Sequence, residues 1–170
     1  MFTFFTLARM MAESAELIKS LLEVGTVYHS LLFSYQRGLK YYMGDRANVY
    51  VHPAIEHLLN MDEEGGLKLG NSKSFEEAVS AFTDFLVRSK VVKNCTLEKI
   101  GEEKYVFRVE GCIWAGKVHT RQVSLKDVTC PYALIAMAFY KKYKGFISSE
   151  NDSEYFHYGT ETVLEPASRY

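Results

Sequence analysis

Hydrophobic residues in the first quarter of the chain recur at steps of three and four residues. This spacing predicts a long amphipathic helix over residues 12–42, or two helices that meet near Gly25. A short strand is expected over 49–51, and Pro53 suits the first position of a further helix over 54–59. The residues that set the first pattern are Leu17, Ile18, Leu21, Leu22, Val24, Val27, Leu31, Leu32, Tyr35, Leu39 and Tyr42.

Residues 61–74 interrupt the apolar pattern with Gly, Asn, Ser and charged side chains, and this composition is typical of a loop. The loop separates a helical part, about 1–60, from an α+β part, about 75–166, of what we expect to be a single domain. Ser74 is followed three residues later by Glu77, which is the pattern of a helix capping box. A helix is therefore predicted over 75–87.

Strand-like alternation follows, because apolar residues at 105, 107 and 109 alternate with the residues between them. Together with 95–100 and the turn residues 101–103, this pattern predicts an antiparallel hairpin. If Leu97 and Val109 share the core face of that hairpin, Cys95 lies on the same face.

A second apolar helix should begin after Cys130 and Pro131 and end before Gly145, where basic residues gather. It is apolar nearly all round, so we expect it to be buried. The aromatic and β-branched residues of 155–164 then predict a closing strand. The fold class that results is α+β, with N-terminal helices followed by a mostly antiparallel sheet that packs on one buried core helix.

Composition narrows the function classes. The 170 residues are 48% hydrophobic and 24% charged, as in an ordinary globular domain, and a net charge of −1 disfavours nucleic acid as a partner. Three cysteines form no disulfide framework, which indicates a cytoplasmic setting. The apolar N-terminal run meets Arg9 before it reaches the length of a membrane span, so no membrane span is predicted.

Cys112, His119 and Cys130 carry the thiol and imidazole donors that zinc prefers. Cys130 also falls at the predicted start of the buried helix, where unpaired backbone N–H groups favour a thiolate. These three residues are our candidate zinc ligands. The fourth ligand stays open between Cys95, Asp127, His157 and water, and the alternative is that the two thiols are simply buried and the histidine lies in a surface loop.

Aromatic residues make up 14% of the chain, and aromatic side chains often line pockets for apolar ligands. The alternatives are core packing, or a dimer face along the long N-terminal helix. The residues that we expect to line a pocket for a hydrophobic small molecule are Tyr28, Phe33, Tyr35, Tyr42, Phe139 and Tyr140.

The segments VEGCIWAGKVHT, DVTCPYALIAMAFYKK and FHYGTETVLEP, in that order, resemble the 4-vinyl reductase family, particularly its small stand-alone archaeal members described as hydrocarbon-binding. The resemblance covers about 75–166. It implies a sensor-like α+β domain that encloses a small apolar ligand, forms a homodimer, and in some members carries a cysteine-ligated zinc, which would fall on Cys112, His119 and Cys130. Family members tend to have cysteines near the closing hairpin, whereas 158–166 has none here.

Three functions are consistent with these patterns. The first is a binding or sensor-like module for a hydrophobic small molecule, with a zinc site beside it. The second is a thiol-dependent enzyme in which Cys130 is the nucleophile and His119 the base. The third is a structural subunit that assembles through its long N-terminal helix. The sequence contains no Gly-rich phosphate loop, no GxSxG and no HExxH.

Overall fold

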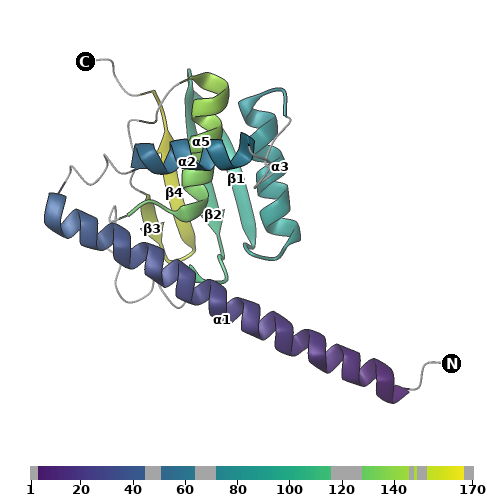
Figure 1. The fold of residues 1–170 in the computed structure, drawn as a ribbon. Helices are drawn as coiled ribbons and strands as arrows, with labels where there is room; N and C mark the ends of the chain where they lie inside the picture. Colours follow the sequence, from purple (N-terminus) through teal and green to yellow (C-terminus); the bar gives the residue numbers. More distant parts are fainter. Residues whose placement is uncertain are drawn as a thin grey trace.

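The computed structural model describes residues 4–44, 51–63, 72–115, 128–145, 148 and 153–166, without the side chains of 4–10, 62 and 63. Within these residues the chain forms helices and a four-stranded antiparallel sheet, which confirms the predicted α+β class (Figure 1). In chain order the elements are α1 (Phe4–Met43), α2 (Val51–Glu63), α3 (Phe75–Arg88), β1 (Asn94–Gly101), β2 (Lys104–Glu110), α5 (Pro131–Lys144), β3 (Glu154–Phe156) and β4 (Gly159–Leu164).

The sheet has the order β1-β2-β4-β3, so two hairpins meet at the central pair β2 and β4. The register of the first hairpin confirms the predicted core face, because Cys95 lies opposite Val109 and Leu97 lies opposite Phe107. Successive side chains of a strand point to opposite faces of the sheet. Cys95, Phe107 and Val109 therefore face the same core.

The other face of the sheet is charged. The guanidinium of Arg108 on β2 forms ion pairs with Glu98 on β1 and with Glu161 on β4. These three side chains form a row across neighbouring strands, which suits a face that meets solvent.

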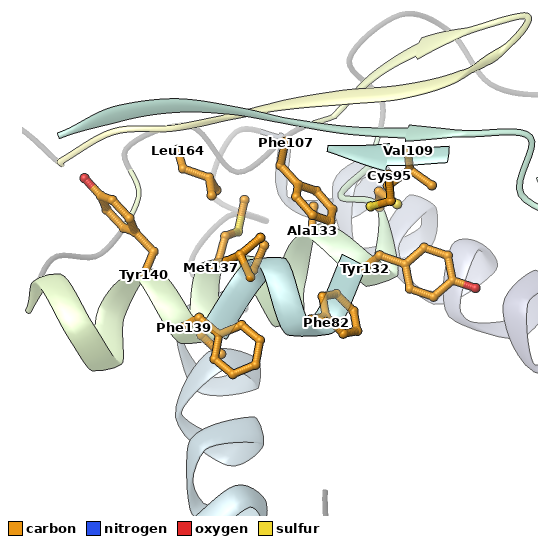
Figure 2. Close-up of a cluster of buried hydrophobic side chains, with 14 of the residues drawn as sticks. Phe82, Cys95, Phe107, Val109, Tyr132, Ala133, Met137, Phe139, Tyr140 and Leu164 are labelled. Carbon is orange, nitrogen blue, oxygen red and sulfur yellow. The ribbon is translucent and has the colours of Figure 1, made fainter. Parts of the chain in front are cut away.

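One side of the sheet is covered by helices. Helix α5 packs on β2 and β4, α3 packs on β1 and on α5, and α2 crosses α5 on the side away from the sheet (Figure 1). Figure 2 shows Ala133 and Met137 of α5 directed toward the sheet, and Phe139 directed away from it toward Phe82. Helix α5 is thus enclosed on both sides, as its apolar sequence predicts.

Local signals set the helix ends. The Ser74 hydroxyl accepts a hydrogen bond from the Glu77 backbone N–H at 3.1 Å, so the predicted cap of α3 is confirmed. Cys130 is the N-cap of α5, and Gly145 ends that helix with a left-handed φ of 76°. Glycine adopts this conformation without steric cost.

Helix α1 joins the rest of the molecule, which we call the α/β body, through its C-terminal half. The side-chain amide of Gln36 donates to the Thr129 carbonyl at 3.1 Å and accepts from the Thr129 N–H at 2.9 Å. Phe33 packs edge-on against Tyr155, with ring centroids 5.6 Å apart. The residues of 11–24 are all exposed, and the N-terminal half of the helix projects past the body (Figure 1).

Two local predictions need correction, and one lies outside the described residues. The single strand expected over 155–164 is a hairpin, β3 and β4, because a turn at His157 and Tyr158 reverses the chain. Gly159 comes directly after this turn and lies very close to β2. A Cβ there would lie 1.8 Å from the Val109 carbonyl oxygen. Residues 61–63 were expected in a loop, but they continue α2. Of the strand expected over 49–51, residues 49 and 50 lie outside the described residues, and Val51 is the first residue of α2.

Candidate functional site

The N-terminal helix carries an extensive exposed apolar surface. Thirteen of its large hydrophobic side chains are more than a third exposed. Soluble monomers rarely leave so large a contiguous apolar surface open to water, and such surfaces usually mark a binding site. We call this set the α1 apolar surface; it consists of Met11, Leu17, Ile18, Leu21, Leu22, Val24, Val27, Tyr28, Leu31, Leu32, Tyr35, Tyr41 and Tyr42.

A groove of about 400 Å³ lies on this surface, near the C-terminal end of α1. Gly38 is one of its lining residues, and a Cβ added at this position would have no atom within 4 Å. The groove is lined almost entirely by apolar atoms. The described residues around it are Leu31, Ser34, Tyr35, Gly38, Leu39, Tyr42 and Met43.

The six residues predicted to line one pocket fall in two different environments. Phe33, Phe139 and Tyr140 are buried and pack within the protein. The other three, Tyr28, Tyr35 and Tyr42, lie on α1 with at least two thirds of each side chain exposed. Among the described residues the six therefore form no common pocket; Tyr35 and Tyr42 line the α1 groove, and the buried three belong to the core.

The three cysteines converge from different elements. Cys95 lies on β1, Cys112 follows β2, and Cys130 caps α5, and all three are buried free thiols. They lie close enough that Cys130 affects the pKa of Cys95, and Cys112 affects the pKa of Cys130. Cys95, Cys112 and Cys130 all belong to the main hydrophobic core cluster.

Burial favours the protonated form of two of these thiols, Cys95 and Cys130. It raises the pKa of Cys95 to about 12. Burial also raises the pKa of Cys130, although the Thr160 hydroxyl and the backbone N–H groups at the start of α5 act in the opposite direction. The sequence led us to expect a thiolate at Cys130; the cost of burying a charge outweighs the helix N-terminus here.

The predicted metal site has only part of its ligand set within the described structure. His119 and Asp127 lie outside the described residues. Within the described ranges, no three His, Cys, Asp or Glu side chains are arranged to hold a metal ion. The buried hydroxyl of Tyr132 lies against Cys112 and Cys130, and its pKa is raised by burial and then by those two thiols. As described, the thiols pack as apolar core groups around Tyr132.

A second hollow, of about 310 Å³, lies between α3 and the first hairpin and has polar side chains at its rim. There the Tyr105 hydroxyl donates to the Glu76 carboxylate at 2.5 Å, and this hydrogen bond lowers the pKa of Glu76. Lys144 completes the group at 3.3 Å from Glu76 and 3.1 Å from Glu103. These polar groups satisfy one another and tie α3, α5 and β2 together, so we assign them a structural role.

The contact between α1 and the body depends on His29 and Trp114, which the sequence patterns did not single out. His29 packs against Trp114, with ring centroids 5.8 Å apart. Gly25 brings the helix still closer, because a Cβ there would lie 2.7 Å from the Trp114 indole nitrogen. A glycine near the middle of a long helical pattern was the available signal, since an interior glycine costs helix stability and therefore often has a packing reason.

The described helices include none that combines the length and apolar character of a membrane span. Comparison with known proteins finds no matching family model, and no curated protein or solved structure with significant similarity. The resemblance to the 4-vinyl reductase family therefore stays a prediction, and the function has to be argued from the geometry of this chain.

Proposed function

We propose that this protein is a non-catalytic binding module that holds an apolar partner along the α1 apolar surface. The observation that carries the proposal is the exposure of thirteen large hydrophobic side chains on one helix. Elsewhere among the described residues most such side chains lie in a continuous core, and the few exposed ones, such as Phe85 and Ile100, are spread over several elements.

The physical reason is the cost of leaving this surface in water. Apolar surface that leaves water gains about 25 cal/mol per Å². A helix of this length also gains most of its stability from packing of its apolar face rather than from helix propensity. The half of α1 that projects past the body is therefore expected to need a partner for full helical order.

The alternative of a thiol-dependent enzyme has less support. Burial raises the pKa of Cys130, which favours the unreactive thiol over the nucleophilic thiolate. A thiol-selective reagent should consequently react slowly with all three cysteines of the folded protein near neutral pH, and equally fast with all three after denaturation. One fast thiol in the folded protein would favour the enzyme instead.

Native mass spectrometry of the purified full-length chain tests the binding function directly. We expect species heavier than the 19.5 kDa chain, either from bound small molecules or from further polypeptide. A bare monomer over the whole accessible concentration range would contradict the proposal.

A hydrophobic small molecule is a second candidate for the occupant, and the groove at Gly38 favours it. A volume of about 400 Å³ lies within the range of small-molecule sites. Gly38→Leu should fill this groove without a clash, because nothing lies within 4 Å of the added Cβ. Extraction of the wild-type protein with organic solvent, followed by mass spectrometry, should release a ligand that the Gly38→Leu protein lacks; Ala12→Leu, at an exposed position of the same helix outside the groove, is the matched control.

The zinc site at Cys112, His119 and Cys130 also remains a prediction. Elemental analysis of protein prepared without a metal-affinity resin should give near one zinc per chain if the site exists. That zinc should be lost in Cys112→Ser and retained in Cys95→Ser if Cys95 is not the fourth ligand. If the protein as purified is folded and contains no zinc, the zinc site is ruled out.

A further inference from the structure

We propose that the partner of α1 is a second copy of this chain, and that the two α1 helices pair antiparallel. This inference rests on the proposed function, since it names the occupant of the α1 apolar surface. It is carried by the spacing of the exposed residues, by the area they offer and by the charge of the two helix halves.

The spacing along α1 is that of a coiled coil. One set of residues, which we call the α1 seam, follows alternating steps of four and three, an average of 3.5. Apolar residues with this spacing form a narrow stripe that packs against another helix, each side chain fitting between those of the partner. The seam consists of Leu17, Leu21, Val24, Tyr28, Leu31, Tyr35, Gly38 and Tyr42.

The α1 seam is separate from the face that contacts the body. That docking face contains Gly25, His29, Phe33 and Gln36. At 3.6 residues per turn, the middle of the seam lies about 120° around the helix from the middle of the docking face. A second helix can therefore occupy the seam while α1 stays packed on its own body.

The area is sufficient for a stable dimer. At on the order of 100 Å² for each side chain, the thirteen residues of the α1 apolar surface offer about 1,300 Å², which exceeds the ~800 Å² that each partner of a standard specific interface buries. Tyrosine and leucine dominate it, and no charged residue occupies a seam position. Such a surface resembles the apolar interfaces of permanent dimers.

Charge favours the antiparallel orientation. Residues 11–24 contain three glutamates and one lysine, whereas 25–43 contain Arg37 and Lys40 and no acidic residue. In an antiparallel pair, each acidic half lies along the basic half of the partner. In a parallel pair, like charges would lie side by side, which is unfavourable.

The projecting half of α1 carries exposed apolar residues on a second face, and these give an independent reason for the antiparallel orientation. Met11, Ile18 and Leu22 are exposed and lie on the same side of α1 as the docking face, beyond the end of the body. A parallel partner would bring only its own projecting half to this region. An antiparallel partner brings its C-terminal half with its body attached, and that body supplies a surface that can cover these side chains.

The same arrangement completes the groove at Gly38. Glycine leaves a gap in the seam between Tyr35 and Tyr42, and the projecting half of the second copy would lie across that gap. The open groove of one chain then becomes an enclosed space whose walls come from both chains. Any small molecule held there would be bound at the dimer interface.

The first measurement is the mass in solution of the full chain as a function of concentration, by sedimentation. We expect twice the chain mass, and we expect Val24→Glu, in the middle of the seam, to raise the dimer Kd by about 30-fold or more. Ala12→Glu adds the same charge to an exposed position of the same helix outside the seam, and it should leave the mass unchanged. A wild-type monomer, or a dimer that Val24→Glu does not weaken, would overturn the proposal.

Disulfide cross-linking then tests the orientation. Two copies of Leu17→Cys should not form a disulfide with each other. A mixture of Leu17→Cys with Tyr35→Cys or with Tyr42→Cys should form a disulfide between the two chains; these two partner positions differ by one heptad and so cover two registers of the pair. The wild-type chain is the negative control, because its three cysteines are buried and should not cross-link. Self-linked Leu17→Cys would show a parallel pair and overturn the orientation.

Native mass spectrometry separates this inference from the proposed function. A monomer that carries a small molecule would refute the dimer and support the binding function. A bare monomer would refute both.

Discussion

The α/β body and helix α1 are both rich in apolar residues but differ in how much of them they expose. In the body, Phe107 and Ala133 are fully buried between the sheet and its helices. On α1, Leu17 and Tyr35 are exposed by 61% and 67%. The body buries most of its own hydrophobic pattern, whereas α1 leaves much of its pattern exposed, and this difference is the reason why we propose a partner for α1.

Truncating an aromatic side chain should affect the two regions very differently. Phe107→Ala removes a buried ring from the core and should lower the free energy of unfolding by about 3–5 kcal/mol. Tyr41→Ala removes a ring that is 84% exposed and should change it by less than about 0.5 kcal/mol. Urea denaturation at a protein concentration below the dimer Kd, followed by circular dichroism, measures both; equal losses would mean that the body of the same chain covers Tyr41.

Two glycines of α1 should respond in opposite directions to the same substitution. Gly25→Ala places a methyl group against Trp114 and should destabilise the contact between α1 and the body by about 1–3 kcal/mol. Gly38→Ala meets nothing within 4 Å and should stabilise the helix by about 0.5–1 kcal/mol. Trp114 is the only tryptophan of the chain, so its fluorescence reports on this contact; an unchanged spectrum in Gly25→Ala would argue against the docking described.

Two serines extend the comparison to helix ends. Ser74→Ala removes the cap of α3 and should cost about 1 kcal/mol. Ser34→Ala removes a hydroxyl in the middle of α1 that only bonds back to the Ser30 carbonyl, at 2.8 Å, and should be neutral or slightly stabilising. Thermal unfolding measures the difference, and the prediction is wrong if Ser34→Ala costs as much as Ser74→Ala.

Acidification should weaken the contact between α1 and the body modestly. Burial lowers the pKa of His29 below the ordinary value of 6.5. The unfolded chain therefore binds more protons than the folded chain just below pH 6.5, so stability falls as the pH is lowered through that range. His29→Gln should reduce this loss between pH 7.5 and 5.5. His52, whose pKa is also lowered by burial and by Lys141, gives a matched control as His52→Gln, because it lies on α2 and should leave the Trp114 signal unchanged.

Most of the body could be predicted from the sequence because its signals are local. Ser74 and Glu77 fixed the start of α3, and Pro131 and Gly145 bounded α5. The hairpin register followed from two-residue alternation, which placed Cys95 on the core face. The turn at 157–158 was missed because aromatic residues favour strands, and the requirement for Gly159 comes from the carbonyl of Val109 on another strand.

The site was harder to predict because it depends on contacts between distant residues. Helical periodicity shows that α1 has apolar positions on more than one side, but contacts with Trp114, Thr129 and Tyr155 determine which side meets the body. For the same reason Phe33 is buried while Tyr35, two residues later, is exposed. The direction of the shift in the Cys130 pKa could not be predicted from neighbouring residues, because it depends on burial by other elements of the fold.

The row of Glu98, Arg108 and Glu161 across the outer sheet face has a consequence for how far assembly can proceed. Covering that row with another sheet would strip water from three charges, and their mutual attraction seldom repays this cost. An isologous pair uses the same patch on both chains and leaves no copy of it open. Because the outer sheet face is costly to cover, assembly should stop at two chains, and concentrated solutions should contain no filaments.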